Sequence, residues 1–270
     1  MNPIFVSDLH LRAEGDERRI AVFTRFIEAL QGRCEQLFIV GDLFDFYIDF
    51  PDAPHFFPEY RPIFDALADL DRKGTRVVFF EGNHDFRLSS FFYHGLGIEV
   101  ITEDNSVLLG GYQCYLAHGD QVNSTDTKYL ALRRFLRGPI FSLLLRLAPR
   151  NWIPSLGKYF SDKSRTRPTA KTGEIEKLYR DFARSKWEEG YDVVILGHNH
   201  RRDQFEAIVG GRRRQYFNLG QWTDSSLPYL ELTPQGFVFG DAGVALRVGG
   251  ELAPVNVRPL VRKTGSSSQS

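Results

Sequence analysis

Residues 4–10 read Ile-Phe-Val-Ser-Asp-Leu-His, a short apolar run that ends in a polar turn. Four further apolar runs have the same form, at residues 37–40, 77–80, 112–117 and 193–196. Their β-branched and aromatic residues favour strands. The polar turns that follow them contain Gly-Asp at 41–42, Glu-Gly-Asn-His-Asp at 81–85, His-Gly-Asp at 118–120 and Gly-His-Asn-His at 197–200. Five predicted strands therefore carry His, Asp and Asn side chains at their carboxyl ends.

The segments between these strands predict helices. Apolar residues recur at helical spacing over residues 18–30 and 62–70, so the first third alternates strand and helix, as in a parallel sheet with helices on its faces. Residues 125–189 also look helical, with predicted breaks at Gly138-Pro139, Pro149, Pro154 and Pro168. Further strands are expected at residues 100–101, 107–109, 205–209, 215–218, 229–232 and 237–239, the second joined to residues 112–117 by a Gly-Gly hairpin.

Composition limits the class of protein. The chain has 270 residues, 42% of them hydrophobic, and its 34 basic and 34 acidic residues give no net charge. These values argue against a disordered chain and against a general nucleic-acid-coating protein. Two cysteines are too few for a disulfide framework, and neither a signal peptide nor a membrane-spanning run is recognisable. We therefore expect a cytoplasmic protein.

Residues 127–171 form a strongly cationic segment, with 11 basic residues and one acidic residue among many apolar ones. A helical insert with one apolar and one basic side can lie on anionic lipid. We interpret residues 121–171 as a cap over the site that contacts lipid. The alternative, a helical hairpin packed on the core with solvated arginines, stays open. Because the excess of positive charge is concentrated in this insert and does not surround the acidic turns, no nucleic-acid partner is expected.

Five of the seven histidines lie in the polar turns. Imidazole, carboxylate and amide groups together suit two borderline transition-metal ions held close to each other. In each of the pairs Asp8–His10 and His198–His200, one residue separates the two members, so in extended chain both side chains face the same way. Asp42 can bridge two cations with its two oxygens. A metal pair suits hydrolysis of a phosphate ester or anhydride.

Taken in order, the five motifs resemble the calcineurin-like metallophosphoesterase superfamily over residues 4 to about 220. The expected fold is a four-layer αββα sandwich, in which helices flank two mixed β-sheets. It forms a single domain over residues 1–263 that includes the cap, followed by a disordered tail at 264–270. The resemblance implies that one metal ion binds Asp8, His10, Asp42 and His200. It implies that a second binds Asp42, Asn83, His118 and His198, and that both are divalent ions of the Mn²⁺ type.

Within the superfamily, residues 38–50, 85–88 and 219–222 are similar to the pyrophosphatases that act in lipid A biosynthesis. Those enzymes cleave UDP-2,3-diacylglucosamine to UMP and an acylated sugar phosphate at the cytoplasmic face of the inner membrane. The resemblance thus implies a lipid-linked nucleotide-sugar substrate and a peripheral membrane location. It also implies substrate-binding residues, which would be Asn83, His84, Asp126, Ser164, Lys171 and His198.

Position 84 leaves two interpretations open. In the pyrophosphatase branch an Arg follows the Asn of this motif, whereas here the residue is His84. His84 can act as a general acid oriented by Asp85, or it can contact a phosphate group. The alternative function is a phosphodiesterase or phosphatase with another substrate, such as a nucleotide or a phosphoprotein. A non-catalytic scaffold is disfavoured because all seven ligand positions are filled.

Two expectations concern acidic residues near the motifs. Asp45, Asp49 and Asp52 follow the Gly-Asp turn and are interpreted as a solvated acidic loop. Asp120 follows the predicted ligand His118, and we expect it to orient that imidazole.

Overall fold

The computed structural model describes residues 2–49, 57–147 and 172–243, so the expected tail and the breaks at Pro149, Pro154 and Pro168 lie outside the described residues. Its larger sheet has six strands in the order β13-β12-β1-β2-β4-β6. Four are mutually parallel: β1 (Asn2–Val6), β2 (Cys34–Val40), β4 (Arg76–Phe80) and β6 (Glu99–Ile101). The other two, β12 (Pro228–Thr233) and β13 (Gly236–Asp241), pair antiparallel. The sheet is therefore mixed, as expected.

The second sheet has five strands in the order β10-β11-β9-β8-β7. Their bounds are β7 Asn105–Leu109, β8 Tyr112–Ala117, β9 Val193–Leu196, β10 Asp203–Val209 and β11 Arg212–Asn218. Strand β9 pairs parallel with β8 and β11, whereas the outer strands form antiparallel hairpins. The predicted Gly110-Gly111 hairpin is confirmed, and the predicted strands 112–117 and 193–196 match the observed bounds.

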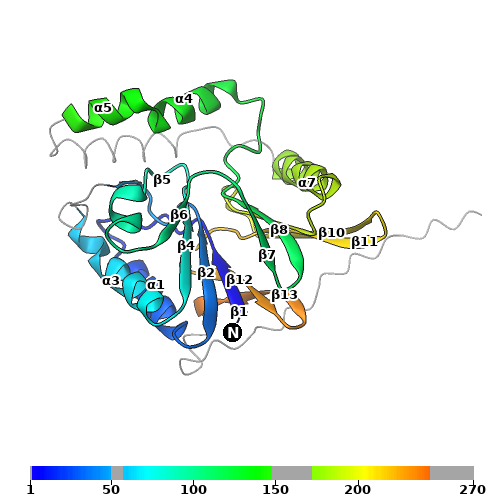
Figure 1. The fold of residues 1–270 in the computed structure, drawn as a ribbon, viewed down its shortest axis with the longest axis horizontal. Helices are drawn as coiled ribbons and strands as arrows, with labels where there is room; N and C mark the ends of the chain where they lie inside the picture. The colour runs from blue at the N-terminus through cyan, green and yellow to red at the C-terminus, as the bar shows by residue number, and fades with distance from the viewer. Residues whose placement is uncertain (1, 50–56, 148–171, 244–270) are drawn as a thin grey trace, which may run out of the picture.

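The two sheets pack face to face (Figure 1). Because successive side chains on a strand point to opposite faces, Phe5 enters the core between the sheets while Ile4 and Val6 face the helices. The rings of Phe5 and Phe38 stack at a centroid distance of 4.9 Å within that inner core. Both faces of β1, β2 and β4 are thus buried over most of their length, which explains their apolar runs at residues 4–6, 37–40 and 77–80.

Helices cover the two outer faces. α1 (Glu17–Ala29) and α3 (Arg61–Arg72) pack their apolar sides on the larger sheet, and α7 (Thr172–Glu188) packs Trp187 and Tyr179 on the smaller one. Figure 1 shows the resulting four layers. The expected αββα sandwich is therefore confirmed.

Two further helices follow β8. α4 (Thr127–Arg137) and α5 (Pro139–Leu147) lie beyond the end of the sandwich opposite the N-terminus (Figure 1). The predicted break falls at Gly138. On their inner side, Phe141 and Leu145 pack against Ile48 and Phe86. No helix in the described part of the chain combines the length and the hydropathy needed to cross a membrane.

Ile48 and Phe86 belong to a two-stranded parallel ribbon that the sequence pattern did not predict. It pairs β3 (Tyr47–Ile48) with β5 (Asp85–Phe86) directly beside the motif turns. Two short helical turns at Pro58–Tyr60 and Ser89–Tyr93 were also missed. Elements of two to five residues are too short for hydrophobic periodicity to reveal them.

Candidate metal centre

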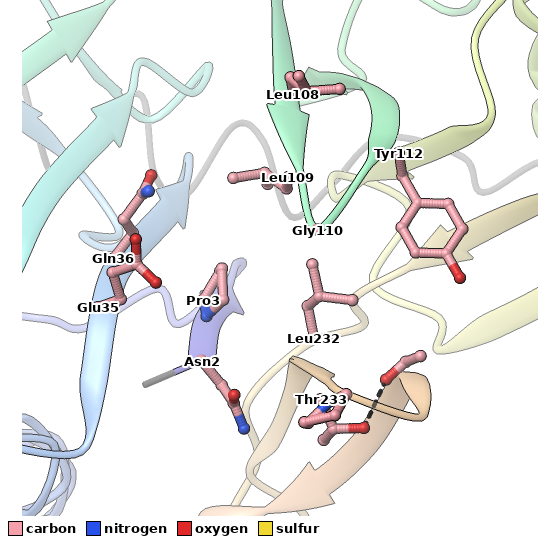
Figure 2. A pocket seen from close by; sticks show the side chains of 12 residues that line it. Asn2, Pro3, Glu35, Gln36, Leu108, Leu109, Gly110, Tyr112, Leu232 and Thr233 are labelled. Carbon is pink, nitrogen blue, oxygen red and sulfur yellow. Dashed lines mark hydrogen bonds between the residues drawn. The ribbon is translucent and has the colours of Figure 1, made fainter.

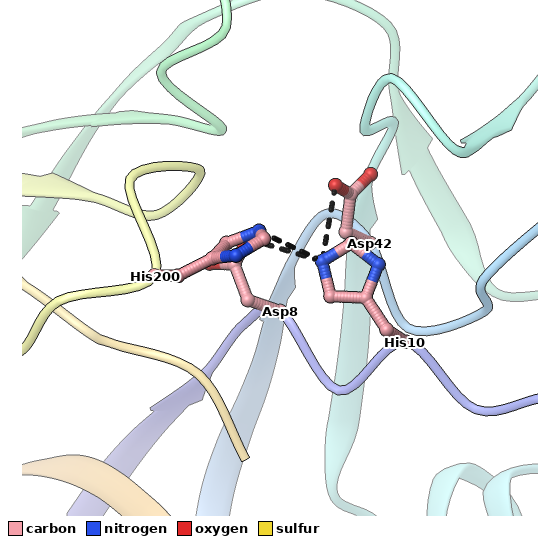
Figure 3. Close-up of side chains that lie close together, drawn as sticks. All are labelled: Asp8, His10, Asp42 and His200. Carbon is pink, nitrogen blue, oxygen red and sulfur yellow. Dashed lines mark hydrogen bonds and ion pairs between the residues drawn. The ribbon is translucent and has the colours of Figure 1, made fainter. Parts of the chain in front are cut away.

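The turns after β1, β2, β4, β8 and β9 meet at the end of the sandwich that faces α4 and α5. Figure 3 shows four of their side chains, with the imidazoles of His10 and His200 facing each other and the carboxylate of Asp42 beside them. Parallel strands end at the same edge of a sheet, so this convergence follows from the topology.

The backbone of these turns is strained. Asp8, His10, Asp42, His198 and His200 all have positive φ, between 46° and 68°. Arg87, with φ of 63°, is the other such non-glycine residue in the described part of the chain. The left-handed conformation costs about 1–2 kcal/mol for a residue with a side chain. Strain of this kind gathers at functional sites, and here it falls on five predicted metal ligands.

The first predicted ligand group is close-packed. One side-chain nitrogen or oxygen from each of Asp8, His10, Asp42 and His200 lies within 4.8 Å of the others. His10 Nε2 is 3.0 Å from His200 Nε2 and 3.6 Å from Asp42 Oδ2. His200 Nε2 is 3.6 Å from Asp8 Oδ1. Four candidate ligand atoms therefore converge on one point.

The second group lies on the other side of Asp42. His118 Nε2 is 3.3 Å from Asp42 Oδ2, 3.1 Å from Asn83 Oδ1 and 3.2 Å from His198 Nδ1. His118 Nδ1 is 2.9 Å from the carbonyl oxygen of Val40 and must donate to it, since a carbonyl only accepts. That bond leaves the lone pair of Nε2 for a metal ion.

Asp42 joins the two groups. Its Oδ1 accepts a hydrogen bond from the His84 amide at 2.9 Å. Its Oδ2 is buried, has no hydrogen-bond partner among the described residues and faces imidazoles of both groups. A buried carboxylate oxygen without a partner is costly, and cations on either side would satisfy it. The donor set therefore fits two divalent ions bridged by Asp42.

Charge within the centre shifts two imidazole pKa values in opposite directions. Burial disfavours a charged His118, but the nearby carboxylates of Asp42, Asp8 and Asp120 together outweigh burial and raise the pKa of His118 to about 10. Burial, followed by the charge of His118, lowers the pKa of His198 to about 4. Without metal, the proton of the pair therefore resides on His118, and a cation that binds there must displace it.

Asp8 and Asp42 are held by hydrogen bonds and by close packing against glycines. Ser7 Oγ donates to Asp8 Oδ2 at 2.6 Å, and the His198 amide donates to the same oxygen at 2.9 Å. A Cβ on Gly82 would lie 2.1 Å from Asp42 Oδ1, and one on Gly197 would lie 2.1 Å from Ser7 Oγ. Only glycine fits at these two positions.

The structure corrects the expected partner of His84. Its Nδ1 is 2.6 Å from the backbone carbonyl of Asp45 and donates to it. The Asp85 carboxylate instead accepts four backbone amides, listed here with their distances: Asp42 at 2.9 Å, Gly82 at 3.0 Å, Leu43 at 2.6 Å and Phe44 at 3.2 Å. Asp85 thus holds the turn that presents Asp42, and it is a positioning residue because its carboxylate is committed to these amides.

Asp45 and Asp49 are buried, so the expectation of a solvated loop is wrong for both. An Asp45 carboxylate oxygen lies within 4.8 Å of a ring nitrogen of both His10 and His84, whose rings meet edge to face at a centroid distance of 4.8 Å. Asp49 accepts amides of Phe91 and Phe92, which anchors the loop. Asp52 lies outside the described residues. Sequence reasoning missed the role of Asp45 because its contact with His84 is made by the backbone.

Two other predicted residues have partners outside the metal groups. Asp126 is the N-cap of α4, where its exposed carboxylate accepts the Tyr129 amide at 3.0 Å. Asp120 accepts Tyr129 Oη at 2.5 Å and Arg133 Nε at 2.8 Å, which corrects the expectation that it orients His118. Ser164 and Lys171 lie outside the described residues.

A cavity of about 360 Å³ lies at the other end of the sandwich, beside Asn2 (Figure 2). Its described lining includes Glu35, Gln36, Tyr112 and several apolar residues, but no histidine. The chemistry of the five motifs is therefore concentrated at the opposite end.

Comparison with known proteins identifies the family of the chain. The sequence profile of the calcineurin-like phosphoesterase family matches residues 1–202. The UDP-2,3-diacylglucosamine hydrolase of Azotobacter vinelandii is 33% identical over 82% of this chain and 91% of its own length. The enzyme of the same name from Pseudomonas syringae pv. tomato is 31% identical over 88% and 94%.

The likeness to solved structures is weaker. Vps29 of Cryptosporidium parvum is 14% identical with a TM-score of 0.43 over 88% of each chain. The assignment therefore rests on the family profile, which covers most of the chain, and on relatives that align over nearly their whole length. On these grounds the chain belongs to the calcineurin-like phosphoesterase family.

Proposed function

We propose that the chain hydrolyses the diphosphate of UDP-2,3-diacylglucosamine and releases UMP and 2,3-diacylglucosamine 1-phosphate. The observation that carries the proposal is the buried Asp42 carboxylate, which belongs to both of the candidate ligand groups. This arrangement suits a phosphohydrolase that uses two metal ions. The identity with relatives named as hydrolases of this substrate supports the choice of substrate.

Two divalent ions are proposed as cofactors, with Mn²⁺ as the expected metal. Asp8, His10, Asp42 and His200 would hold one, and Asp42, Asn83, His118 and His198 the other. The carboxylate and amide oxygens suit Mn²⁺, and the imidazole nitrogens suit transition-metal ions in general. When bound, such ions lower the pKa of water and neutralise phosphoryl oxygens.

We assign His84 to the substrate phosphate. Its Nδ1–H donates to the Asp45 carbonyl, so a contact between the ring and the substrate phosphate would be made through Nε2. Whichever phosphorus is attacked, the leaving group is a phosphate anion that hardly needs a proton, so a charge-assisted hydrogen bond to the diphosphate is favoured over general acid catalysis. Asn83 and His198, at the second metal position, would border the same phosphate. Ser164 and Lys171 are proposed to bind the sugar portion.

The cap supplies an apolar surface for the lipid portion. Six large apolar side chains of α4 and α5 are exposed: Leu132, Phe135, Ile140, Leu143, Leu144 and Leu147. We propose that this surface, with the basic residues of the segment, places the protein on the cytoplasmic face of the inner membrane and receives the acyl chains.

Vesicle flotation tests the membrane proposal. The double variant Leu144→Gln/Leu147→Gln should lose most binding to anionic vesicles, whereas Ile208→Gln should not. Ile208 is a suitable control because it is 72% exposed, similar to Leu147 at 74%, but lies on β10. Equal vesicle binding by the wild type and both variants would contradict the membrane role, and it would leave the proposal of a metal centre unaffected.

The test of the function is incubation with Mn²⁺ and UDP-2,3-diacylglucosamine, beside a simple aryl phosphodiester, with products identified by mass. UMP and diacylglucosamine 1-phosphate, with little turnover of the aryl ester, would establish the substrate. Turnover of the aryl ester alone would favour a general phosphodiesterase or phosphatase and would contradict the lipid A assignment.

A further inference from the structure

Helix α4 reaches one of the turns that carry the second ligand group. Arg137, in its last turn, donates from Nη2 to the carbonyl oxygen of Gly82 at 2.8 Å and pairs through Nε with Glu81 Oε2 at 3.3 Å. Its guanidinium also lies 5.6 Å from the centroid of the Phe86 ring. Asn83 directly follows Gly82, so the guanidinium clamps the peptide that presents this ligand.

The clamped turn has little freedom. Glu81 is 4% exposed, and its other oxygen accepts the Leu88 amide at 2.9 Å. Gly82 packs so closely on Asp42 that even a Cβ would overlap the carboxylate. Removal of Arg137 would leave Glu81 buried without its ionic partner, which favours movement of the whole turn. A shift of the turn would displace Asn83.

A second arginine of the same helix reaches the other turn. Arg133 pairs with Asp120 Oδ2 at 2.8 Å and with Glu103 Oε1 at 3.0 Å, and it is itself 8% exposed. Asp120 lies two residues after His118, in the same turn. Tyr179 Oη also donates a hydrogen bond to this turn, at the Gly119 carbonyl, with a distance of 2.9 Å. The arginines of α4 thus contact the turns of two residues in the second group.

The first ligand group is supported from elsewhere. Arg19, on α1, donates from Nη2 to the carbonyl of Leu9, between the ligands Asp8 and His10. The Trp222 amide donates to the carbonyl of Asp8 at 3.2 Å. Apart from the shared Asp42, the ligands of the two metal positions are therefore supported by different parts of the fold.

We propose that Arg137, assisted by Arg133, makes α4 the positioning element of the second metal position. The inference rests on the proposed ligand sets, and it predicts that the helix controls the affinity of the second ion while the first binds normally. Neither arginine is a solvated cation of the cap, because both are engaged by acidic residues beside the centre.

The test is a Mn²⁺ titration followed by electron paramagnetic resonance, in which free, singly bound and paired ions are distinguished. Arg137→Met should weaken one binding step by about 10–100-fold, the usual effect of losing a partner that supports a metal ligand, and leave the other unchanged. It should resemble Asn83→Ala and differ from His10→Ala. Arg134→Met is the matched control: Arg134 is exposed on the same helix, and both binding steps should be unchanged.

Activity provides a second readout. If Arg137 acts through the second ion, excess Mn²⁺ should restore most of the kcat of Arg137→Met, which a general loss of structure would not allow. Arg137→Lys keeps the charge but loses the two-point contact, so it should show an intermediate Mn²⁺ requirement and serves if the Met variant does not fold.

The outcomes separate the two proposals. A wild-type protein that binds fewer than two ions contradicts the proposed metal centre. A wild-type protein that binds two, with Arg137→Met weakening both steps equally or neither, overturns the role of α4 alone.

Discussion

The same strands run between the two ends of the β-sandwich, but the turns at the two ends differ in which residues adopt a positive φ. At the end near Asn2, the hairpin turns have positive φ at Gly110, Gly111, Gly210, Gly211 and Gly236, where glycine adopts it without strain. At the other end, aspartates and histidines adopt it. The difference teaches that the strain is placed where side chains are needed as ligands.

The cost of this arrangement is considerable. At about 1–2 kcal/mol for each residue, the five strained ligands together oppose folding by an amount comparable to the net stability of a typical domain. Dense hydrogen bonding around Asp8 and Asp42 holds the turns in place. Metal ions that bind only the folded chain would offset the strain further.

Loss of the shared ligand is expected to have the largest effect. Asp42→Ala removes a donor from both groups, so both ions should be lost and phosphohydrolase activity should fall by at least about a thousand-fold, since even an outer partner of a ligand is worth about 10–100-fold. Metal analysis of the purified variant and kcat measurement check this. Two tightly bound ions in the variant would contradict the bridging role.

A pair of glycine substitutions compares the two ends directly. Gly82→Ala puts a Cβ onto Asp42 and should reduce activity by at least about a hundredfold with a large loss of stability, since buried overlap cannot relax cheaply. Gly111→Ala meets no atom within 4 Å and should cost only the backbone strain of about 1–2 kcal/mol. The free energy of unfolding in denaturant and kcat are measured for both variants. Similar losses of stability and activity at the two positions would contradict the difference between the two ends.

His84 tests the chemistry at the strained end. His84→Ala should lower kcat by about 10–100-fold, as expected for a lost charge-assisted hydrogen bond, and His84→Arg should recover most of the activity. A loss near 10³-fold that grows with the basicity of the leaving group would instead assign general acid catalysis. A loss below tenfold would remove His84 from the mechanism.

Metal removal should affect stability moderately. Each ion present at about 100 times its Kd adds about 2.7 kcal/mol, so removal of both ions should lower Tm by about 10–20 °C. In Asp42→Ala the chelator should have little effect. A wild-type Tm that is insensitive to chelation would mean that metal binding does not offset the strain.

Much of this organisation is predictable from sequence because its signals are local. An apolar run followed by a polar turn marks both a strand and its functional end, and this pattern placed Asp8, Asp42 and His118 together without knowledge of the fold. Helix periodicity likewise predicted α1 and α3 within one or two residues of their observed bounds.

The remaining features depend on contacts that leave no local trace. The Asp45 carbonyl that holds His84 is backbone, and the amides that bind Asp85 are backbone as well, so residue identity says nothing of either. Arg137 contacts Glu81, which lies 56 residues earlier in the sequence. From composition alone, we therefore interpreted Arg137 as one of the basic residues of the cap. Short elements such as β3 and β5 form only because tertiary packing aligns them.

Anomalous diffraction at the manganese edge, from crystals grown with Mn²⁺, tests the central claim most directly. Two peaks about 3.5–4 Å apart on either side of Asp42, one near His10 and His200 and one near His118 and His198, are the predicted result. A single peak, or a pair that Asp42 does not bridge, would contradict the account.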